Sequence, residues 1–214
     1  MLDEKFYNKL IEKVKSYLEE NGGHNFDHIN RVYRNSIKIS QDENVDLDIV
    51  KTAALLHDIA RLKEFKDKEI CHAEEGAKMS KEILKEMDFP EEKINKVSYS
   101  IKVHRYSKGI EPETKEAAIL QDADRLDALG AIIIGRVFEF GGKNERPSYN
   151  PNEDPEKKYV SNGGHSSITH FHRKILKITP EKFHTKKAKE MAKERYDFVK
   201  KFIDRYKKEW HGEL

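Results

Sequence analysis

The chain has 214 residues, a length that suits one large domain or at most two small ones and allows a buried hydrophobic core. Charged residues make up 37% of the sequence, yet 41 basic and 39 acidic side chains leave a net charge of only +2. This balance argues against a protein whose main role is to coat nucleic acid or an anionic membrane. No apolar run approaches the length of a membrane span, and the N-terminal residues lack a signal-peptide core. Because Cys71 is the only cysteine, no intramolecular disulfide can form, and we expect a cytoplasmic protein.

Apolar residues recur at helical spacing along most of the chain, and strand-like alternation of useful length is missing from it. We therefore expect an all-α fold of about eight helices in one domain that spans residues 1–214. The expected helices cover residues 3–20, a segment that opens near Asn25 or Asp27 and reaches 39, and then 46–58, 72–87, 90–104, 112–131 (the longest), 166–175 and 185–210.

Two stretches interrupt the helical pattern. Residues 61–68 are basic and irregular, which indicates either a solvated linker or a loop that grips phosphate beside a metal. Residues 141–164 are rich in Pro, Gly, Asn and Ser, and a loop of this length in a compact domain is typical of a lid or a binding loop. His165, His170 and His172 follow this loop. Because residues two apart do not share a helical face, we interpret these histidines as unlinked.

A charged pair follows an apolar run of the sequence. Residues 49–56 are typical of a buried helix, and His57 and Asp58 come next, where the chain is expected to be still inside the protein. Burying a carboxylate is costly unless a partner neutralises it. An imidazole beside a carboxylate can hold a divalent metal ion between them. The alternative interpretation is a helix end at which Asp58 is solvated.

Two other expected helices carry ligands of the same kind. His28 lies in the first turn of the second expected helix, where a capping or surface role is the alternative. Asp124 lies on the small, apolar stripe of the helix expected at 112–131, whereas Asp122 does not. Taken jointly, the order His28, His57-Asp58, Asp124, with every member at an inward position, predicts a metal site with these four ligands.

Two more histidines fall between these ligands. His72 opens an expected helix and shares a face with Glu75, so this pair is a candidate for proton transfer or water orientation. The alternative is a helix-start histidine and a surface glutamate. His104 continues an inward apolar stripe, where a hydrogen-bonded core histidine is the alternative to a functional one.

Five segments of the chain resemble a known family: 28–32 (HINRV), 54–60 (ALLHDIA), 72–77 (HAEEGA), 121–130 (QDADRLDALG) and 166–171 (SSITHF). Together they resemble the HD-domain superfamily of metal-dependent phosphohydrolases, in particular its small stand-alone hydrolases, which include nucleoside triphosphate pyrophosphohydrolases. The resemblance implies an all-helical HD fold with an octahedral divalent ion, commonly Mn²⁺, at His28, His57, Asp58 and Asp124. In that scheme the metal-site core covers about 25–130, the lid-like loop 141–164, and the C-terminal helices 166–210.

Two features limit what the resemblance implies. Several relatives place an acidic residue three or four positions after the His-Asp pair, whereas this chain has Arg61 and Leu62 there, and its nearest acids are Glu64 and Asp67. Some HD enzymes hold a second metal with two further histidines, and His72 and His104 stand in suitable order for that. We expect a single ion, with Mn²⁺ favoured over Ni²⁺, Co²⁺, Mg²⁺ or Fe²⁺, and keep a second metal at His72 and His104 as the alternative.

A divalent ion held by two His and two Asp retains about two open positions of six, so it can bind a phosphoryl oxygen and a water together. Basic residues near the ligand motifs suit a polyphosphate. The candidate substrate-binding residues are Arg31, Arg61, Lys66, His104, Arg105, Lys108 and Arg125.

We therefore expect metal-dependent hydrolysis of a phosphate ester or anhydride in a small molecule, with nucleotides as the expected class. Pyrophosphate release from a nucleoside triphosphate is one such reaction. A regulatory nucleotide-binding module without turnover and a helical scaffold with buried ion pairs are the alternatives. We expect no membrane or nucleic-acid partner, and a homodimer remains an open alternative.

Overall fold

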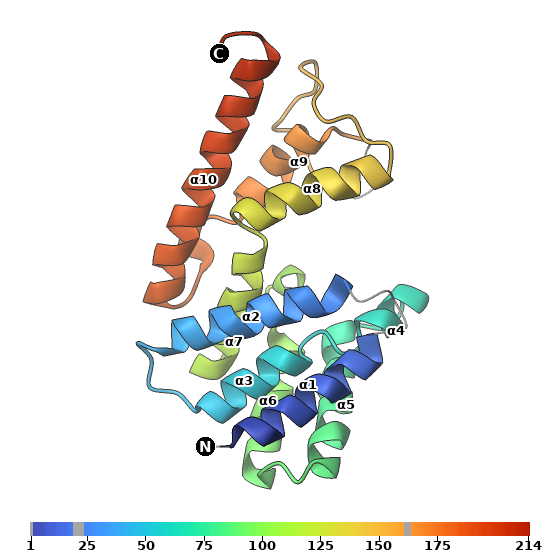
Figure 1. Cartoon of the computed structure of the whole chain (residues 1–214), viewed down its shortest axis with the longest axis vertical. Helices are drawn as coiled ribbons and strands as arrows, with labels where there is room; N and C mark the ends of the chain where they lie inside the picture. The colour runs from blue at the N-terminus through green and yellow to red at the C-terminus, as the bar shows by residue number, and fades with distance from the viewer. Residues whose placement is uncertain (1, 19–23, 161–163) are drawn as a thin grey trace. The chain divides into compact units, whose positions relative to one another are not determined.

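The computed structural model describes residues 2–18, 24–160 and 164–214, and over these ranges the chain is helical without any β-strand. The chain divides into two compact units, residues 1–124 and 125–214. Figure 1 shows the helices of both units in chain order. Within the described ranges, no helix combines the length and the apolar character that crossing a bilayer requires.

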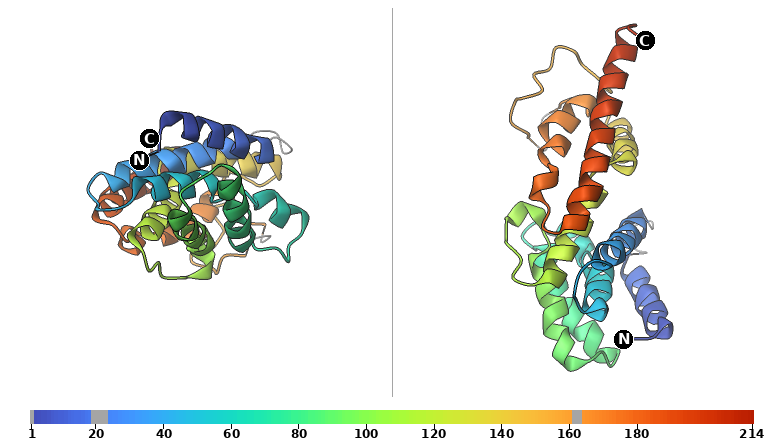
Figure 2. Two further views of the ribbon diagram at one scale, coloured as in Figure 1. Left: turned by 90° about the horizontal axis from the view of Figure 1, so that it is seen from below. Right: turned by 90° about the vertical axis from the view of Figure 1, so that its left-hand side faces the viewer.

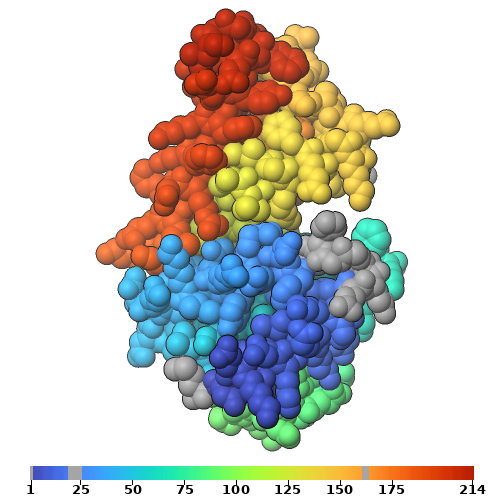
Figure 3. Space-filling model, in the orientation of Figure 1, coloured from blue at the N-terminus to red at the C-terminus, as the bar shows by residue number. Residues whose placement is uncertain are grey.

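The first unit is built from helices that cover each other around α3. Their bounds are α1 Glu4–Leu18, α2 His24–Ser40, α3 Leu47–Leu56, α4 Arg61–Lys66, α5 His72–Glu86, α6 Glu91–Val103 and α7 Lys115–Asp127, with a 3₁₀ turn, Tyr106–Lys108, before α7. Helix α3 contacts α1, α2 and α6, and α5 packs along α6 (Figure 2). Helices α1 and α2 cover one face of this unit (Figure 3).

Helix α3 is central because its sequence is apolar on every side. Residues Ile49, Val50 and Ala53 to Leu56 are all buried, as a helix without a polar face requires. Asp46 caps the helix by accepting a hydrogen bond from the backbone N–H of Asp48 at 2.9 Å. Leu56, at the C-terminus of the helix, is therefore buried in the interior of the unit, and so is the His57-Asp58 pair that follows it.

A buried carboxylate ties the N-terminus of α3 to its neighbours. Asp48 accepts hydrogen bonds from the Tyr7 hydroxyl at 3.0 Å and from the Leu2 backbone N–H at 2.9 Å. Lys93 Nζ lies 2.8 Å from its second oxygen. Burial raises the pKa of Asp48, but these partners outweigh that effect and lower it from 3.8 to about 2. The cluster therefore holds α1, α3 and α6 together through one charge.

The second unit is formed by the helices after α7. Their bounds are α8 Ala131–Lys143, α9 Ser167–Arg173 and α10 Lys186–Trp210, with short 3₁₀ turns at Ile175–Lys177 and Pro180–Lys182. Helix α8 contacts both α9 and α10. An aromatic cluster joins the three helices, with Phe138 of α8 within 6.1 Å, centroid to centroid, of Phe171 and within 6.0 Å of Phe202.

The all-α prediction is confirmed, and most expected helices are found within a few residues of their predicted ends. The prediction of one helix over 112–131 is wrong, because the helical segment is interrupted before Ala131 and forms α7 and α8. The longest helix is α10 rather than this segment. Gly130 has φ 87° and ψ −158°, a backbone conformation that residues other than glycine seldom adopt. The long loop begins at 144 rather than 141, because α8 continues to Lys143. Asn25 and Asp27 lie inside α2 rather than capping it.

Three further expectations are corrected by the structure. The stretch expected to be irregular contains the short helix α4. Asp122, judged to lie off the buried stripe of its helix, is fully buried, whereas Asp124 is partly exposed. His165 and His170 are linked rather than independent, because their rings stack at 5.5 Å, with His165 Nε2 3.2 Å from His170 Nδ1. The loop that precedes α9 brings them together, and His172 instead contacts Lys207 of α10.

Asp48→Asn keeps the shape of the buried side chain and removes its charge, so we expect the free energy of unfolding at pH 7 to fall by about 2 kcal/mol. A carboxyl group with a lowered pKa stabilises the fold above its unfolded value of 3.8 and loses that effect as the pH falls toward about 2. The difference between wild type and variant should therefore shrink over this range. Urea unfolding followed by circular dichroism measures it. Asp42→Asn, at an exposed site, is the control, and equal stability of all three proteins at pH 7 would refute the assignment.

Gly130→Ala should destabilise the second unit by about 1–3 kcal/mol, because alanine is strained at this backbone conformation. An added Cβ would also lie 3.1 Å from Cγ of Arg195. Gly135→Ala is the matched comparison, because Gly135 is inside α8 with open space around it, and there alanine should stabilise the helix by about 0.5–1 kcal/mol. Thermal unfolding of the two variants should move in opposite directions. Unchanged stability of Gly130→Ala would contradict this account.

Candidate metal centre

The candidate site is assembled at helix ends of the first unit. His57 follows α3 as its C-terminal cap, and His104 caps the C-terminus of α6. His72 is the first residue of α5, while His28 lies in the second turn of α2. Gln121 of α7 donates hydrogen bonds to the backbone carbonyl of Val103 at 2.7 Å, which fixes α7 against the end of α6 and places Asp124 one turn further along. Six side chains from five helices thereby meet in one place.

Asp58 lies at the centre of this group, facing the Nε2 atoms of four imidazoles. Its Oδ2 atom is 3.8 Å from Nε2 of His28 and 3.9 Å from Nε2 of His57. Its Oδ1 atom is 3.4 Å from Nε2 of His72 and 3.8 Å from Nε2 of His104. One carboxylate therefore stands between two pairs of imidazoles.

Backbone carbonyls set the tautomer of two of these rings. Nδ1 of His57 donates to the carbonyl of Ala54 at 2.8 Å, and Nδ1 of His104 donates to the carbonyl of Ile101 at 2.6 Å. A neutral imidazole with its proton on Nδ1 presents a lone pair at Nε2, which is the form that ligates a metal. Both rings are thus oriented with Nε2 toward Asp58.

Asp124 lies beside His28, on the side of the cluster that also contains His57. Its Oδ1 atom is 3.3 Å from Nε2 of His28, which in turn is 3.3 Å from Nε2 of His57. The side chains of His28 and Asp124 keep 19% and 27% of their surface exposed, so a small ligand can reach the cluster on that side. The four ligands predicted from the sequence are therefore brought together by the fold.

Two sets of ligand atoms are close enough to hold an ion. His28, His57 and Asp58 each offer an atom within 4.8 Å of the others, and so do Asp58, His72 and His104. Asp58 belongs to both sets. Imidazole nitrogens and carboxylate oxygens suit Mn²⁺, Fe²⁺, Co²⁺, Ni²⁺ and Zn²⁺. The residues fit a divalent metal centre, and the second set matches the alternative of a further ion at His72 and His104.

Burial and charge put the ligands in the protonation states that a metal requires. Burial lowers the pKa of His57 to about 4, so its imidazole is neutral at pH 7. Burial raises the pKa of Asp58, but His57, His104 and Arg61 outweigh that effect and hold the pKa well below its ordinary value. The pKa of Asp124 is lowered for a similar reason, with His28 as the main opposing partner. Charged carboxylates therefore stand beside the neutral ring of His57, whereas burial lowers the pKa of His104 but a hydrogen bond with Asp58 outweighs that effect and raises it.

A basic and acidic rim surrounds His72. Glu64 of α4 lies 2.8 Å from Nδ1 of His72, and it also accepts a hydrogen bond from Nη1 of Arg105. Nη1 of Arg61 lies 3.0 Å from both ring nitrogens of His72, and its Nε atom is 3.8 Å from Asp58. Of the basic residues expected to bind substrate, Arg61 and Arg105 thus lie at the cluster.

The other predicted site residues occupy different surroundings. Glu75 pairs with Lys63 at 2.7 Å, and Lys108 lies 3.3 Å from Glu74. Lys66 is exposed in the last turn of α4, and Arg31 is partly buried in α2. Arg125 begins the second unit, where its Nη1 atom lies 3.3 Å from Nε2 of His184.

Glu64 lies at the cluster, although no role was expected for it from the sequence. It lies six positions after Asp58, and only the turn made by α4 brings it back to His72. Its spacing from Arg61 at i, i+3 is the one available signal, and that signal depends on recognising the short helix.

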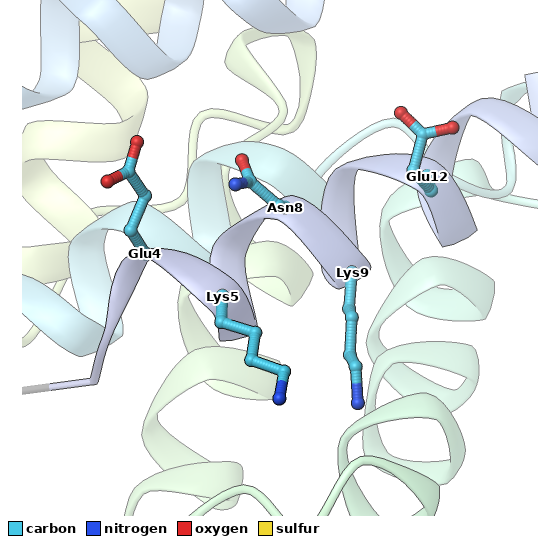
Figure 4. A pocket seen from close by; sticks show the side chains of 5 residues that line it. All are labelled: Glu4, Lys5, Asn8, Lys9 and Glu12. Atoms are coloured by element: carbon cyan, nitrogen blue, oxygen red, sulfur yellow. The ribbon is translucent and has the colours of Figure 1, made fainter.

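A depression on the surface of α1, lined by Glu4, Lys5, Asn8, Lys9 and Glu12, is formed by the solvated side of one helix (Figure 4).

Comparisons with known proteins agree with this geometry. Residues 25–129 match the protein family described as HD domain. An HD-superfamily hydrolase from Bacillus thuringiensis is 35% identical, with a TM-score of 0.79 and 97% of each chain covered. A predicted HD-superfamily hydrolase from an uncultured Thermotogales bacterium is 31% identical, with a TM-score of 0.68, covering 95% of this chain and 92% of its own. YpgQ of Bacillus subtilis, solved in complex with ADP, is 29% identical, with a TM-score of 0.73, covering 96% of this chain and 95% of its own.

Mn²⁺ should bind the wild-type chain and raise its free energy of unfolding, by about 2.7 kcal/mol when the free ion is at 100 times its Kd. Asp58→Asn should lose most of this effect, because Asp58 is shared by both sets of ligand atoms. Isothermal titration and thermal unfolding, with and without EDTA, measure the two quantities. Asp42→Asn is again the control, and an Asp58→Asn variant with wild-type affinity would rule out this centre.

Proposed function

Because this chain belongs to the HD-domain family, whose solved relatives include proteins named as hydrolases, we propose that it is a metal-dependent phosphohydrolase acting on a nucleotide. The observation that carries the proposal is the arrangement of four Nε2 atoms around Asp58, with Asp124 beside His28. His28, His57, Asp58 and Asp124 would hold a divalent ion, which would supply charge neutralisation at phosphorus and lower the pKa of a bound water. We favour Mn²⁺ as that ion.

The residues beside the ligands suit a phosphate substrate. Arg61 and Arg105 place two guanidinium groups at the edge of the cluster, where they can pair with phosphoryl oxygens. His72, with Nε2 directed at Asp58, is placed to hold or move a proton at that atom, or to hold a second ion together with His104. For Glu75, Arg31, Lys66, Lys108 and Arg125, the roles expected from the sequence remain predictions.

The choice of a nucleotide rests on two supports. YpgQ of Bacillus subtilis, a relative over nearly the whole chain, binds ADP in one of its solved structures. The resemblance to small stand-alone HD hydrolases points to pyrophosphate release from a nucleoside triphosphate as the first reaction to test. We also propose that the whole chain works as one HD enzyme, which comprises a metal core at about 25–130, a lid-like loop near 141–164 and the C-terminal helices of 166–210.

The decisive experiment measures phosphate and pyrophosphate release from a panel of nucleoside mono-, di- and triphosphates with Mn²⁺, Ni²⁺, Co²⁺ or Mg²⁺. We expect metal-dependent release from at least one nucleotide and its loss with EDTA. His57→Ala and Asp58→Ala should each lower kcat by at least about 1000-fold, because each removes a ligand of the ion that stabilises the transition state.

Glu74→Ala, which changes an exposed residue of α5, should keep wild-type activity and serves as the control. Tight nucleotide binding without release under any metal would favour a regulatory module over an enzyme. Full activity in either His57→Ala or Asp58→Ala would refute the proposed site.

A further inference from the structure

Three imidazoles around Asp58 share one feature, which is an oxygen acceptor at Nδ1. For His57 and His104 the acceptor is a backbone carbonyl three residues earlier, that of Ala54 or Ile101. For His72 the oxygen lies 2.8 Å from Nδ1 and belongs to the side chain of Glu64.

The position of each histidine on its helix explains this difference. The last carbonyls of a helix have no N–H partner within the helix, so they can accept a hydrogen bond from a side chain. His57 and His104 stand at the C-terminal ends of α3 and α6, where such carbonyls are within reach. His72 is the first residue of α5, and the unpaired backbone groups at that end of a helix are N–H donors. An acceptor for its Nδ1 must therefore come from elsewhere in the chain.

Glu64 is held in place to provide that acceptor. One carboxylate oxygen faces Nδ1 of His72, and the other accepts from Nη1 of Arg105. Burial raises the pKa of Glu64, but hydrogen bonds from His72 and Arg105 outweigh this and lower it, so the group is a carboxylate at neutral pH. A carboxylate can only accept, and Glu64 lies closer to Nδ1, at 2.8 Å, than Asp58 lies to Nε2, at 3.4 Å, so the proton of a neutral His72 is assigned to Nδ1.

The position of Arg61 is consistent with the same tautomer. Its guanidinium can only donate, and Nη1 lies 3.0 Å from both ring nitrogens of His72. Because Nδ1 is already paired with Glu64, Nε2 is the ring atom with a lone pair for a donor or a metal. Nε2 is also the atom that lies 3.4 Å from Oδ1 of Asp58.

We propose that Glu64 is a positioning residue for the metal-dependent reaction, which fixes the Nδ1–H tautomer and the orientation of His72 so that Nε2 faces Asp58. Glu64 thereby does for the start of α5 what the carbonyls of Ala54 and Ile101 do for the ends of α3 and α6. The role in turnover rests on the proposed function, whereas the effect on the tautomer does not.

Nitrogen-15 NMR of the histidine side chains tests the tautomer directly on the full chain in EDTA, since the shifts of Nδ1 and Nε2 distinguish the two neutral forms. The signals of His72 are identified by their disappearance in His72→Asn. We expect the Nδ1–H form in the wild type and in Glu64→Gln, whose amide oxygen still accepts. Glu64→Ala should shift His72 toward the Nε2–H form, while the signals of His57 and His104 stay unchanged.

Mn²⁺ titration and turnover give the second readout. Removing a residue that orients a metal-site histidine typically costs about 10- to 100-fold in affinity or activity. We expect a loss of this size in Glu64→Ala, with kcat falling more than KM changes, and a smaller loss in Glu64→Gln. Glu74→Ala is the matched control, because Glu74 is an exposed glutamate that pairs with Lys108.

The outcomes separate this proposal from the proposed function. A His72 ring that keeps its tautomer in Glu64→Ala, as judged by NMR, overturns the positioning role whatever the activity. A tautomer that changes as expected supports it even if no nucleotide is hydrolysed, in which case only the proposed function fails. If Glu64→Ala does not fold, Glu64→Leu, which keeps the bulk of the side chain but has no acceptor, decides in the same way: a shift of His72 toward the Nε2–H form supports the role, and an unchanged tautomer overturns it.

Discussion

The first unit depends on a single buried carboxylate that faces four imidazoles. Asp58 is nearly inaccessible, and an isolated charge in that position would be costly. The fold meets this cost by ending α3 and α6, and beginning α5, at the same place, so that each helix terminus contributes one ring. A bound cation would stabilise the arrangement further, since the negative charges of Asp58 and Asp124 would then face a positive ion. The positions of these helix termini therefore determine both the packing of the first unit and the arrangement of histidines around Asp58.

The termini of these helices matter as much as their faces. Apolar periodicity explains why α3 is buried on all sides, but it says nothing of where a helix ends. The ends decide which backbone groups are left to orient a side chain. His57 and His104 use carbonyls at C-terminal ends, and His72, at an N-terminal end, relies on Glu64. A common orientation of Nε2 is reached by two different routes.

The sequence was sufficient to predict the helical class and to choose the four candidate ligands that the fold brings together, His28, His57, Asp58 and Asp124. Those predictions depended on residue type and helical spacing, which can be read from the sequence however the helices pack against one another. It was not sufficient at Gly130, where one residue with a positive φ divides an otherwise continuous pattern into α7 and α8. It also missed Glu64 and the pairing of His165 with His170, because both contacts depend on short loops or turns whose path has no periodic signal. The burial of Asp122 was likewise misjudged, because α7 is covered on more than one stripe, with Ile119 and Ala123 buried as well.

A backbone carbonyl and a side-chain carboxylate, the two kinds of acceptor that orient these histidines, differ in how easily mutation can remove them. A point mutation cannot delete the carbonyl of Ala54 or Ile101, so His57 and His104 keep their orientation through drift at those positions. The acceptor for His72 is a side chain, and a single codon change at position 64 removes or alters it. Divergence among descendants of this protein should therefore act first on the His72 side of the centre, leaving the half that contains His57 intact.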